Sequence, residues 1–211
     1  MRRKQIWLLV AGWAALLVVG FGVATLLLNR ANDNQAAVGV TEYRGTLYEP
    51  PLELSDFTLP ASNGEDVSLS DLRGEWVLMF FGYTHCPDFC PLTLSEYRQI
   101  MDMLGADASR VQVVFVSVDS ARDTPVALAR YLERFNPDFL GLSGDDETLA
   151  RIQPEFGFYY ERHEEQGEHY LVDHSTRSYL IDPDGRLRIS YSYGTEREVI
   201  AESIRDILTQ G

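Results

Sequence analysis

Long apolar runs and helix-spaced apolar positions alternate along this chain, which predicts alternating strands and helices. Trp76–Phe81 is apolar at every position, and Val111–Val118 is interrupted by only two polar residues. Both are therefore expected to be strands buried on both faces of a sheet. Between them, Leu92–Leu104 carries apolar residues at three- and four-residue spacing, which predicts a helix with one buried face.

Turn and cap residues set off the elements before and after this centre. Asn63-Gly64 and Asp182-Pro183-Asp184-Gly185 each predict the turn of a hairpin. Thr124-Pro125 joins an N-cap residue to a proline at the first helical position, so a helix is expected to begin there. The other expected elements are a turn at 70–74, a short strand at 139–142, a helix from Asp145 or Asp146 through Ile152, an extended segment at 156–160, and a final helix at 195–208. This order predicts an α/β fold, a thioredoxin-like sandwich with a central mixed sheet flanked by helices.

The N-terminal residues have the composition of a transmembrane helix. Ile6–Leu28 contains no charge and would be about 34 Å long as a helix, enough to cross a bilayer. Arg2, Arg3 and Lys4 precede it, which predicts a cytoplasmic N-terminus. A cleaved signal peptide is the alternative, but its apolar region is usually only about 7–15 residues long. No cysteine stands near the end of the run, so a lipoprotein anchor is not expected.

These features predict three parts. Residues 1–28 are expected to form a cytoplasmic start and a transmembrane anchor, residues 29–50 a flexible tether, and residues 51–211 a globular domain. The chain is then a single-pass protein of the cytoplasmic (inner) membrane, with its C-terminal domain on the periplasmic, extracytoplasmic side.

The charge of the chain excludes several classes of function. Four of the 18 basic residues precede the first acidic residue, Asp33, so the rest is more acidic than the formal net charge of −14. Such a domain repels nucleic acid and anionic lipid, and it suits either a cationic partner or simple solubility. Lys4 is the only lysine, which excludes a Schiff-base or P-loop lysine in the domain.

Cys86 and Cys90 are the only cysteines, and three residues separate them. They follow the predicted strand 76–81, at the edge where open α/β sheets bind ligands. The N-terminus of the helix that follows favours a thiolate. Pro91 disfavours a helical conformation at the second cysteine, so the pair is expected either on one helical turn or in a non-helical loop. Two such thiols can form a structural disulfide, exchange disulfides or bind a metal.

A metal needs a third ligand, and the chain offers His85, His163, His169 and His174. His163 and His169 lie in a charged segment and are expected to be solvated. His85 adjoins the first cysteine, but its side chain should point elsewhere. His174 precedes a predicted strand, in a loop expected to lie beside the cysteine loop. Two thiolates and one imidazole suit Cu(I), can hold Cu(II), and also suit Zn(II).

Three motifs resemble those of the Sco/SenC family. They are FFGYTHCPDFCPLTL at 80–94, VSVDSARDTP at 116–125, and VDHS at 172–175 followed by YLIDPDG at 179–185. The resemblance extends from about residue 45 to the C-terminus and includes the single N-terminal span. The family usually has proline at the position of Ser120, a departure that leaves the ligand positions intact.

The resemblance implies a membrane-anchored thioredoxin-like protein that binds one copper ion per chain through Cys86, Cys90 and His174. It also implies a role in assembling the dinuclear copper centre of cytochrome c oxidase subunit II. Another copper chaperone or a thioredoxin-like reductant would be a further partner. Asp119 and Asp123 match an acidic pair near the family's site and are expected to support the ligands or dock a partner, against the alternative of ordinary cap and turn roles.

Dithiol chemistry is the main alternative. Ordinary thioredoxin-like oxidoreductases have two residues between their cysteines and a cis-proline before a later strand, where this chain has Ser175-Thr176-Arg177. A peroxidase would need a threonine three residues before its cysteine, and Thr84 is only two before. The stronger alternative is a thiol–disulfide reductase that uses Cys86 and Cys90 as its redox pair and keeps the copper-site cysteines of the oxidase reduced. His174 discriminates between copper delivery and thiol–disulfide reduction, because copper delivery requires this residue and dithiol exchange does not.

Overall fold

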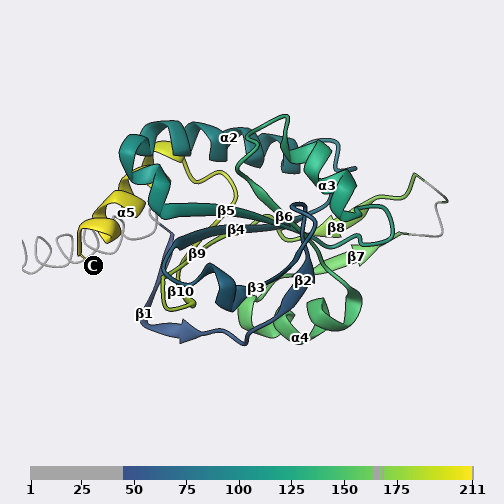
Figure 1. The fold of residues 1–211 in the computed structure, drawn as a ribbon, viewed down its shortest axis with the longest axis horizontal. Helices are drawn as coiled ribbons and strands as arrows, with labels where there is room; N and C mark the ends of the chain where they lie inside the picture. The colour runs from purple at the N-terminus through teal and green to yellow at the C-terminus, as the bar shows by residue number, and fades with distance from the viewer. Residues whose placement is uncertain (1–44, 164–166, 168, 211) are drawn as a thin grey trace, which may run out of the picture. The chain divides into compact units, whose positions relative to one another are not determined.

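A six-stranded mixed sheet lies at the centre of the computed structural model, which describes residues 45–163, 167 and 169–210 (Figure 1). The strand order is β1-β10-β9-β4-β5-β6. The strands are β1 (Thr46–Glu53), β4 (Trp76–Gly82), β5 (Val111–Ser117), β6 (Leu140–Ser143), β9 (Ser178–Ile181) and β10 (Arg186–Tyr191). Strands β4, β5 and β6 are parallel. Strand β9 runs antiparallel to β4, β10 runs antiparallel to β9, and β1 runs antiparallel to β10.

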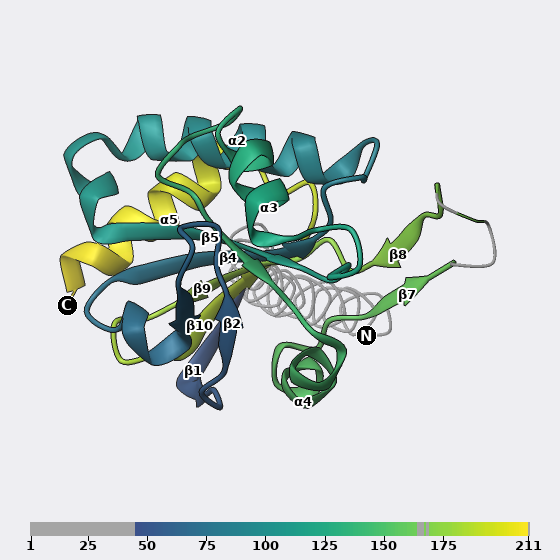
Figure 2. The same cartoon turned by 45° about the vertical axis from the view of Figure 1, so that its right-hand side comes forward.

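Helices cover both faces of this sheet (Figures 1 and 2). They are α2 (Phe89–Leu104), α3 (Pro125–Leu132), α4 (Asp146–Phe156) and α5 (Arg197–Gln210), with 3-10 turns η1 (Leu69–Leu72) and η2 (Gly105–Arg110). The β4-α2-β5 and β5-α3-β6 connections step across the sheet in the same direction, so right-handed crossovers place α2 and α3 on one face. Helix α5 packs beside α2 on that face, and α4 lies on the other.

Two hairpins lie outside the six-stranded sheet. Strands β2 (Thr58–Pro60) and β3 (Asp66–Ser68) form the first, and β7 (Tyr160–Arg162) and β8 (Val172–His174) form the second. The loop of the first hairpin covers the edge of β6, because the Ser62 N–H donates to the Gly141 carbonyl at 2.8 Å. The second hairpin extends away from the sheet (Figure 2).

Strand β4 is the centre of the hydrophobic core, since all seven of its residues are buried. Phe81 stacks on Phe158 with ring centroids 4.0 Å apart and meets Tyr179 edge-on at 5.7 Å. Each buried side chain of this size stabilises the fold by roughly 1.5–3 kcal/mol relative to an exposed one. The loop at 83–88, which carries Cys86 and is called the cysteine loop, therefore follows one of the most rigidly held segments of the domain.

The thioredoxin-like α/β fold and most of its predicted elements are confirmed. The two central strands, the Asn63-Gly64 hairpin and the hairpin at 182–185 form where they were expected. Thr124 caps α3 as predicted, and its Oγ1 accepts the Ala127 N–H at 3.3 Å.

Three boundaries differ from the sequence prediction. Helix α2 begins at Phe89 and includes Cys90, because a proline within the first helical turn gives up an N–H that has no partner inside the helix. Helix α4 continues through Phe156 and ends at the left-handed Gly157, so 156–160 is not extended throughout. Strand β1 begins at Thr46, which places residues 46–50 in the sheet and not in a tether.

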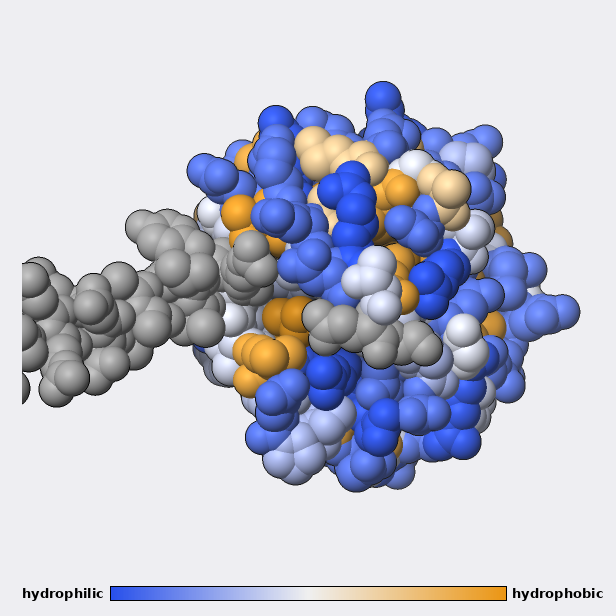
Figure 3. Space-filling model, turned by 90° about the vertical axis from the view of Figure 1, so that its left-hand side faces the viewer, coloured by the Kyte–Doolittle hydropathy of each residue, from blue (hydrophilic) through white to orange (hydrophobic). Residues whose placement is uncertain are grey.

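Helices long and apolar enough to cross a membrane do not occur among the described residues. The predicted anchor at 1–28 lies outside them. Where α5 finishes, the end of the domain presents a largely hydrophilic surface (Figure 3).

Candidate metal centre

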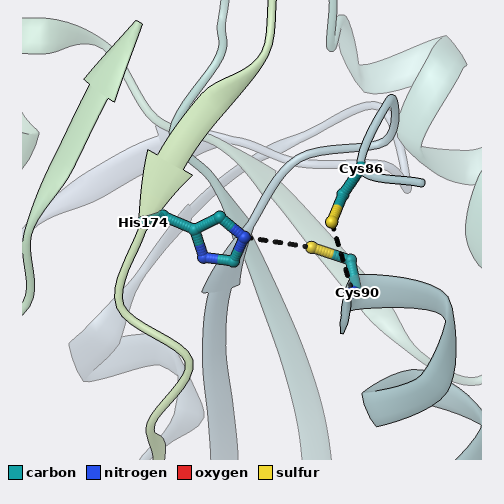
Figure 4. Close-up of side chains that lie close together, drawn as sticks. All are labelled: Cys86, Cys90 and His174. Carbon is teal, nitrogen blue, oxygen red and sulfur yellow. Dashed lines mark hydrogen bonds between the residues drawn. The ribbon is translucent and has the colours of Figure 1, made fainter. Parts of the chain in front are cut away.

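Three of the residues selected from the sequence meet at the carboxyl end of β4 (Figure 4). The strand ends at Gly82, the loop after it carries Cys86, and Cys90 lies in the first turn of α2. His174 is the last residue of β8 and so stands on a strand, not in a loop. The two sulfurs and one imidazole nitrogen all lie within 4.8 Å of one another.

The two cysteines have different electrostatic environments. Cys90 is fully buried, whereas Cys86 keeps 8% of its surface exposed. A hydrogen bond from the Cys90 thiol is the main cause that lowers the pKa of Cys86 to about 3, and the Cys90 backbone N–H also donates to Cys86 Sγ at 3.5 Å. Burial, and then the neighbouring Cys86, raise the pKa of the Cys90 thiol well above its ordinary value. Without a metal, the reduced pair is one thiolate and one thiol at neutral pH.

This asymmetry predicts selective alkylation of the reduced chain. Iodoacetamide should modify Cys86 first, at a rate that is nearly constant between about pH 5 and 8, because the thiolate fraction does not change there. An ordinary thiol would react about tenfold faster with each pH unit in this range. Timed alkylation followed by peptide mass spectrometry measures both rates. A tenfold rise per unit at Cys86, or equal labelling of the two cysteines, would contradict the predicted asymmetry.

His174 presents one specific nitrogen to the sulfurs. Its Nδ1 lies 2.9 Å from the Ser175 carbonyl oxygen, which can only accept, so Nδ1 carries the proton. In the neutral imidazole Nε2 then has the lone pair, 3.5 Å from Cys90 Sγ. The rings of Phe80 and Tyr83 meet the imidazole edge-on at 6.0 and 5.6 Å. This arrangement fixes the tautomer that a metal requires.

The other three histidines do not join this group. His85 has a side chain that is 53% exposed and lies 3.7 Å from Asp123, and its Nδ1 meets Thr84 Oγ1 at 3.0 Å. His163 pairs with Asp173 at 3.0 Å, and His169 is exposed. The expectation that His85 points away from the sulfurs therefore agrees with the geometry.

Asp119 and Asp123 are both fully buried, so neither can make first contact with a docking partner. Asp123 accepts the Thr84 N–H at 2.8 Å, the Thr84 hydroxyl at 2.5 Å and the Ser117 hydroxyl at 2.6 Å. These bonds fix the start of the cysteine loop. Asp119 accepts the Arg122 Nε–H and the Tyr170 hydroxyl, each at 2.5 Å. The burial of both carboxylates disfavours the predicted docking role.

Sequence reasoning did not single out Tyr83, Arg122 or Tyr170, although all three lie around the site. Burial together with the Asp119 hydrogen bond raises the pKa of Tyr170 to about 12, so its hydroxyl stays a donor. The contacts of Arg122 and Tyr170 join segments 48 residues apart. The spacing of apolar residues along the chain gives no information on a contact between two residues so far apart.

The three donors fit a single metal ion. Thiolate and imidazole ligands bind zinc at about 2.0–2.3 Å, so three ligands spread evenly around one ion of similar size lie about 4 Å apart. The three donor atoms lie within 4.8 Å of one another, so binding needs a closure of at most about 1 Å. Two sulfurs and one nitrogen form a soft donor set that suits Cu(I) and leaves room for a further ligand.

Comparison with known proteins agrees with this geometry. The model of the SCO1/SenC family matches residues 46–209, which is nearly all of the described domain. The chain belongs to the SCO1/SenC family. The resemblance inferred from the three sequence motifs is thus confirmed.

Individual SCO1/SenC members match over most of the chain. Bovine mitochondrial protein SCO2 homolog is 37% identical over 194 residues, covering 90% of this chain and 72% of that protein. Copper-bound ScoI of Arabidopsis thaliana superposes with a TM-score of 0.69 at 31% identity, covering 74% of this chain and 98% of that one. Copper-bound ScoI of Bradyrhizobium japonicum gives 0.65 at 37% identity, covering 72% and 97%.

Proposed function

We propose that this chain is a copper metallochaperone that holds one copper ion between Cys86, Cys90 and His174. The observation that carries the proposal is the convergence of these three donor atoms within 4.8 Å at one edge of the sheet. Copper-bound structures of SCO1/SenC members support the choice of copper over zinc. The recipient is the dinuclear copper centre of cytochrome c oxidase subunit II.

Copper is cargo in this mechanism, and the chain supplies ligands that can be exchanged. Cys86 is already a thiolate, whereas Cys90 must lose its proton, so loading releases about one proton per ion at neutral pH. Cys86 keeps 8% of its surface exposed and His174 is half-buried, so these two are the ligands that an incoming recipient ligand can replace first. The fully buried Cys90 then holds the ion until a further recipient ligand arrives.

The same pair favours one alternative, a thiol–disulfide reductase that keeps the copper-site cysteines of subunit II reduced. A low-pKa Cys86 beside a buried Cys90 is the arrangement of an attacking and a resolving thiol. Only the reduced pair can bind copper, so a thioredoxin-like reductant is a required partner in either role. Another copper chaperone is the proposed donor.

The proposed placement follows from the sequence. Residues 1–28 anchor the chain in the cytoplasmic membrane, and a tether that ends before Thr46 leads to the copper-binding domain on the extracytoplasmic side. The exposed acidic surface makes nucleic acid an unsuitable partner.

Replacing His174 with alanine tests the proposed function against its alternative. The purified, reduced full-length chain should bind one equivalent of copper and transfer it to the copper-free soluble domain of oxidase subunit II. His174→Ala should bind copper at least about 100-fold more weakly, roughly 3 kcal/mol at 1.4 kcal/mol per tenfold, and should transfer none. It should reduce the oxidised cysteines of the same domain at the wild-type rate.

Visible spectra of the recipient measure the transfer, and thiol counting measures the reduction. Wild-type copper affinity and transfer in His174→Ala would defeat the three-ligand site. Efficient reduction by the wild-type chain without any copper transfer would establish the reductase instead.

A further inference from the structure

The turn at 118–123 contacts both halves of the candidate metal centre. On the cysteine side, the Val118 N–H donates to the Gly82 carbonyl at 2.8 Å, and Asp123 accepts from Thr84. On the histidine side, Arg122 Nη1 donates to the Tyr170 carbonyl at 2.9 Å, just before β8. A single turn therefore sets the spacing between the cysteine loop and the strand that carries the imidazole.

This connection is important because β8 does not belong to the six-stranded sheet. Among the described strands, β8 pairs only with β7, and the hairpin they form extends away from the sheet (Figure 2). No ladder of backbone hydrogen bonds to β4 or β9 fixes the position of His174 within the described part of the chain. Its position depends on side-chain contacts at the base of the hairpin.

Arg122, Tyr170 and Asp119 form the densest of these contacts. The guanidinium lies 3.5 Å from the centre of the Tyr170 ring, and its Nε–H and the Tyr170 hydroxyl both donate to the Asp119 carboxylate at 2.5 Å. Asp119 is fully buried and Tyr170 only 8% exposed. Buried charges of this kind are stable only while each partner is present, so the cluster has one well-defined arrangement.

Arg122 also contacts the aromatic residue that packs on the imidazole. Its guanidinium carbon lies 5.8 Å from the centre of the Tyr83 ring, and that ring meets His174 edge-on at an angle of 89°. The imidazole is thus fixed from two directions, through the backbone of β8 and through Tyr83.

We infer that Arg122 and Tyr170 are positioning residues that hold His174 within bonding distance of the cysteine-bound ion. The inference rests on the proposed copper site and adds residues that touch neither the ion nor its ligand atoms. Tyr170 acts on copper through His174, because it lies in the hairpin, whereas the cysteine loop is held by Asp123.

Tyr170→Phe is the most selective test. It removes the hydroxyl bond to Asp119 and leaves the ring under Arg122 in place. Residues that orient a metal ligand commonly change metal affinity by about 10- to 100-fold, so a loss of about tenfold in copper affinity is expected from this single bond. In the His174→Ala background the same change should alter copper affinity by less than about twofold, because effects transmitted through one ligand are not additive.

A second variant guards against poor folding. Asp119→Asn combined with Arg122→Gln removes both charges together and avoids an unpaired buried ion. It should weaken copper binding by about 10- to 100-fold in the wild-type background and by a much smaller factor without His174. Arg134→Ala is the matched control, since Arg134 also stacks on a tyrosine, Tyr131, at 4.6 Å, and its Nε–H donates to the Tyr131 carbonyl at 3.3 Å.

Copper alone, titrated into the reduced full-length chain, is the probe. Paramagnetic resonance of the Cu(II)-loaded protein should show weaker nitrogen coupling in Tyr170→Phe, while the alkylation rate of Cys86 should equal that of the wild type. Equal losses of affinity with and without His174, or no loss in either variant, would overturn the inference and leave the three-ligand site standing. A His174→Ala chain with wild-type copper affinity would overturn both.

Discussion

Replacing Cys90 is expected to abolish copper binding, with an affinity loss of at least about a thousandfold, or roughly 4 kcal/mol at 1.4 kcal/mol per tenfold. Cys90 is the fully buried ligand. Its Sγ lies between Cys86 and His174, at 3.5 Å from the Nε2 atom of His174. A serine hydroxyl stays protonated at neutral pH and offers a hard oxygen, which Cu(I) binds poorly. Competition for Cu(I) with a chromophoric chelator measures the loss.

Two Cys90 variants separate its role as a ligand from its effect on Cys86. Cys90→Ser keeps a hydrogen-bond donor beside the Cys86 sulfur, whereas Cys90→Ala does not. Because that hydrogen bond is the main cause of the low Cys86 pKa, the alanine variant should alkylate more slowly at pH 5 than the serine variant. Both should fail to bind copper. Tight binding by either variant would remove Cys90 from the ligand set.

The second large effect is expected from Gly82→Ala, at a residue that is not a ligand. A Cβ atom at Gly82 would lie 2.7 Å from Cys90 Sγ and 2.9 Å from ring carbons of Phe80 and Phe115. Because both rings are fully buried, the sulfur must move or the core must expand. The expected cost is about 1–3 kcal/mol of unfolding free energy, together with at least about a tenfold loss of copper affinity.

Gly141→Ala is the matched control for this prediction. Its Cβ would meet Leu132 at 2.8 Å and Leu128 at 2.9 Å, so the core is equally crowded there, but no sulfur is involved. Urea unfolding should give similar losses of stability for the two variants, and only Gly82→Ala should lose copper affinity. Equal copper affinity in the two variants would show that Cys90 tolerates the displacement.

Local sequence patterns predicted the structure correctly where the residues of one segment determine its conformation. The apolar run at 76–81 and the cap Thr124 predicted a central strand and a helix start, because burial and capping depend on neighbouring residues in sequence. The helix was predicted from Leu92 but begins at Phe89, because Pro91 stands in the first turn, where its missing N–H costs nothing. Of the two geometries expected around Pro91, the structure has Cys90 on the helical turn.

Sequence patterns did not predict the structure correctly where it depends on contacts between two separate segments. The segment at 156–160 was predicted to be extended, yet α4 continues through Phe156 and is capped by Gly157. The β7–β8 hairpin was not predicted, because its charged connection shows no turn motif and its strands are only three residues long. The strand position of His174 was missed for the same reason.

For the candidate site, the sequence by itself determined which donor atoms are available. The chain has only two cysteines and four histidines, and the family motifs selected Cys86, Cys90 and His174 among them. It also determined that both sulfurs follow a buried strand. These facts depend on residue identity and short-range spacing, which a sequence contains in full.

The tertiary structure decided everything that depends on distance across the fold. It placed the Cys90 sulfur against Gly82, assigned the free nitrogen of His174 through the Ser175 carbonyl, and buried Asp119 under Arg122 and Tyr170. The contact of the Cys90 sulfur with Gly82 and that of Tyr170 with Asp119 depend on how β4, α2 and the β7–β8 hairpin pack together. Packing joins residues far apart in the chain, so no local pattern could have contained it.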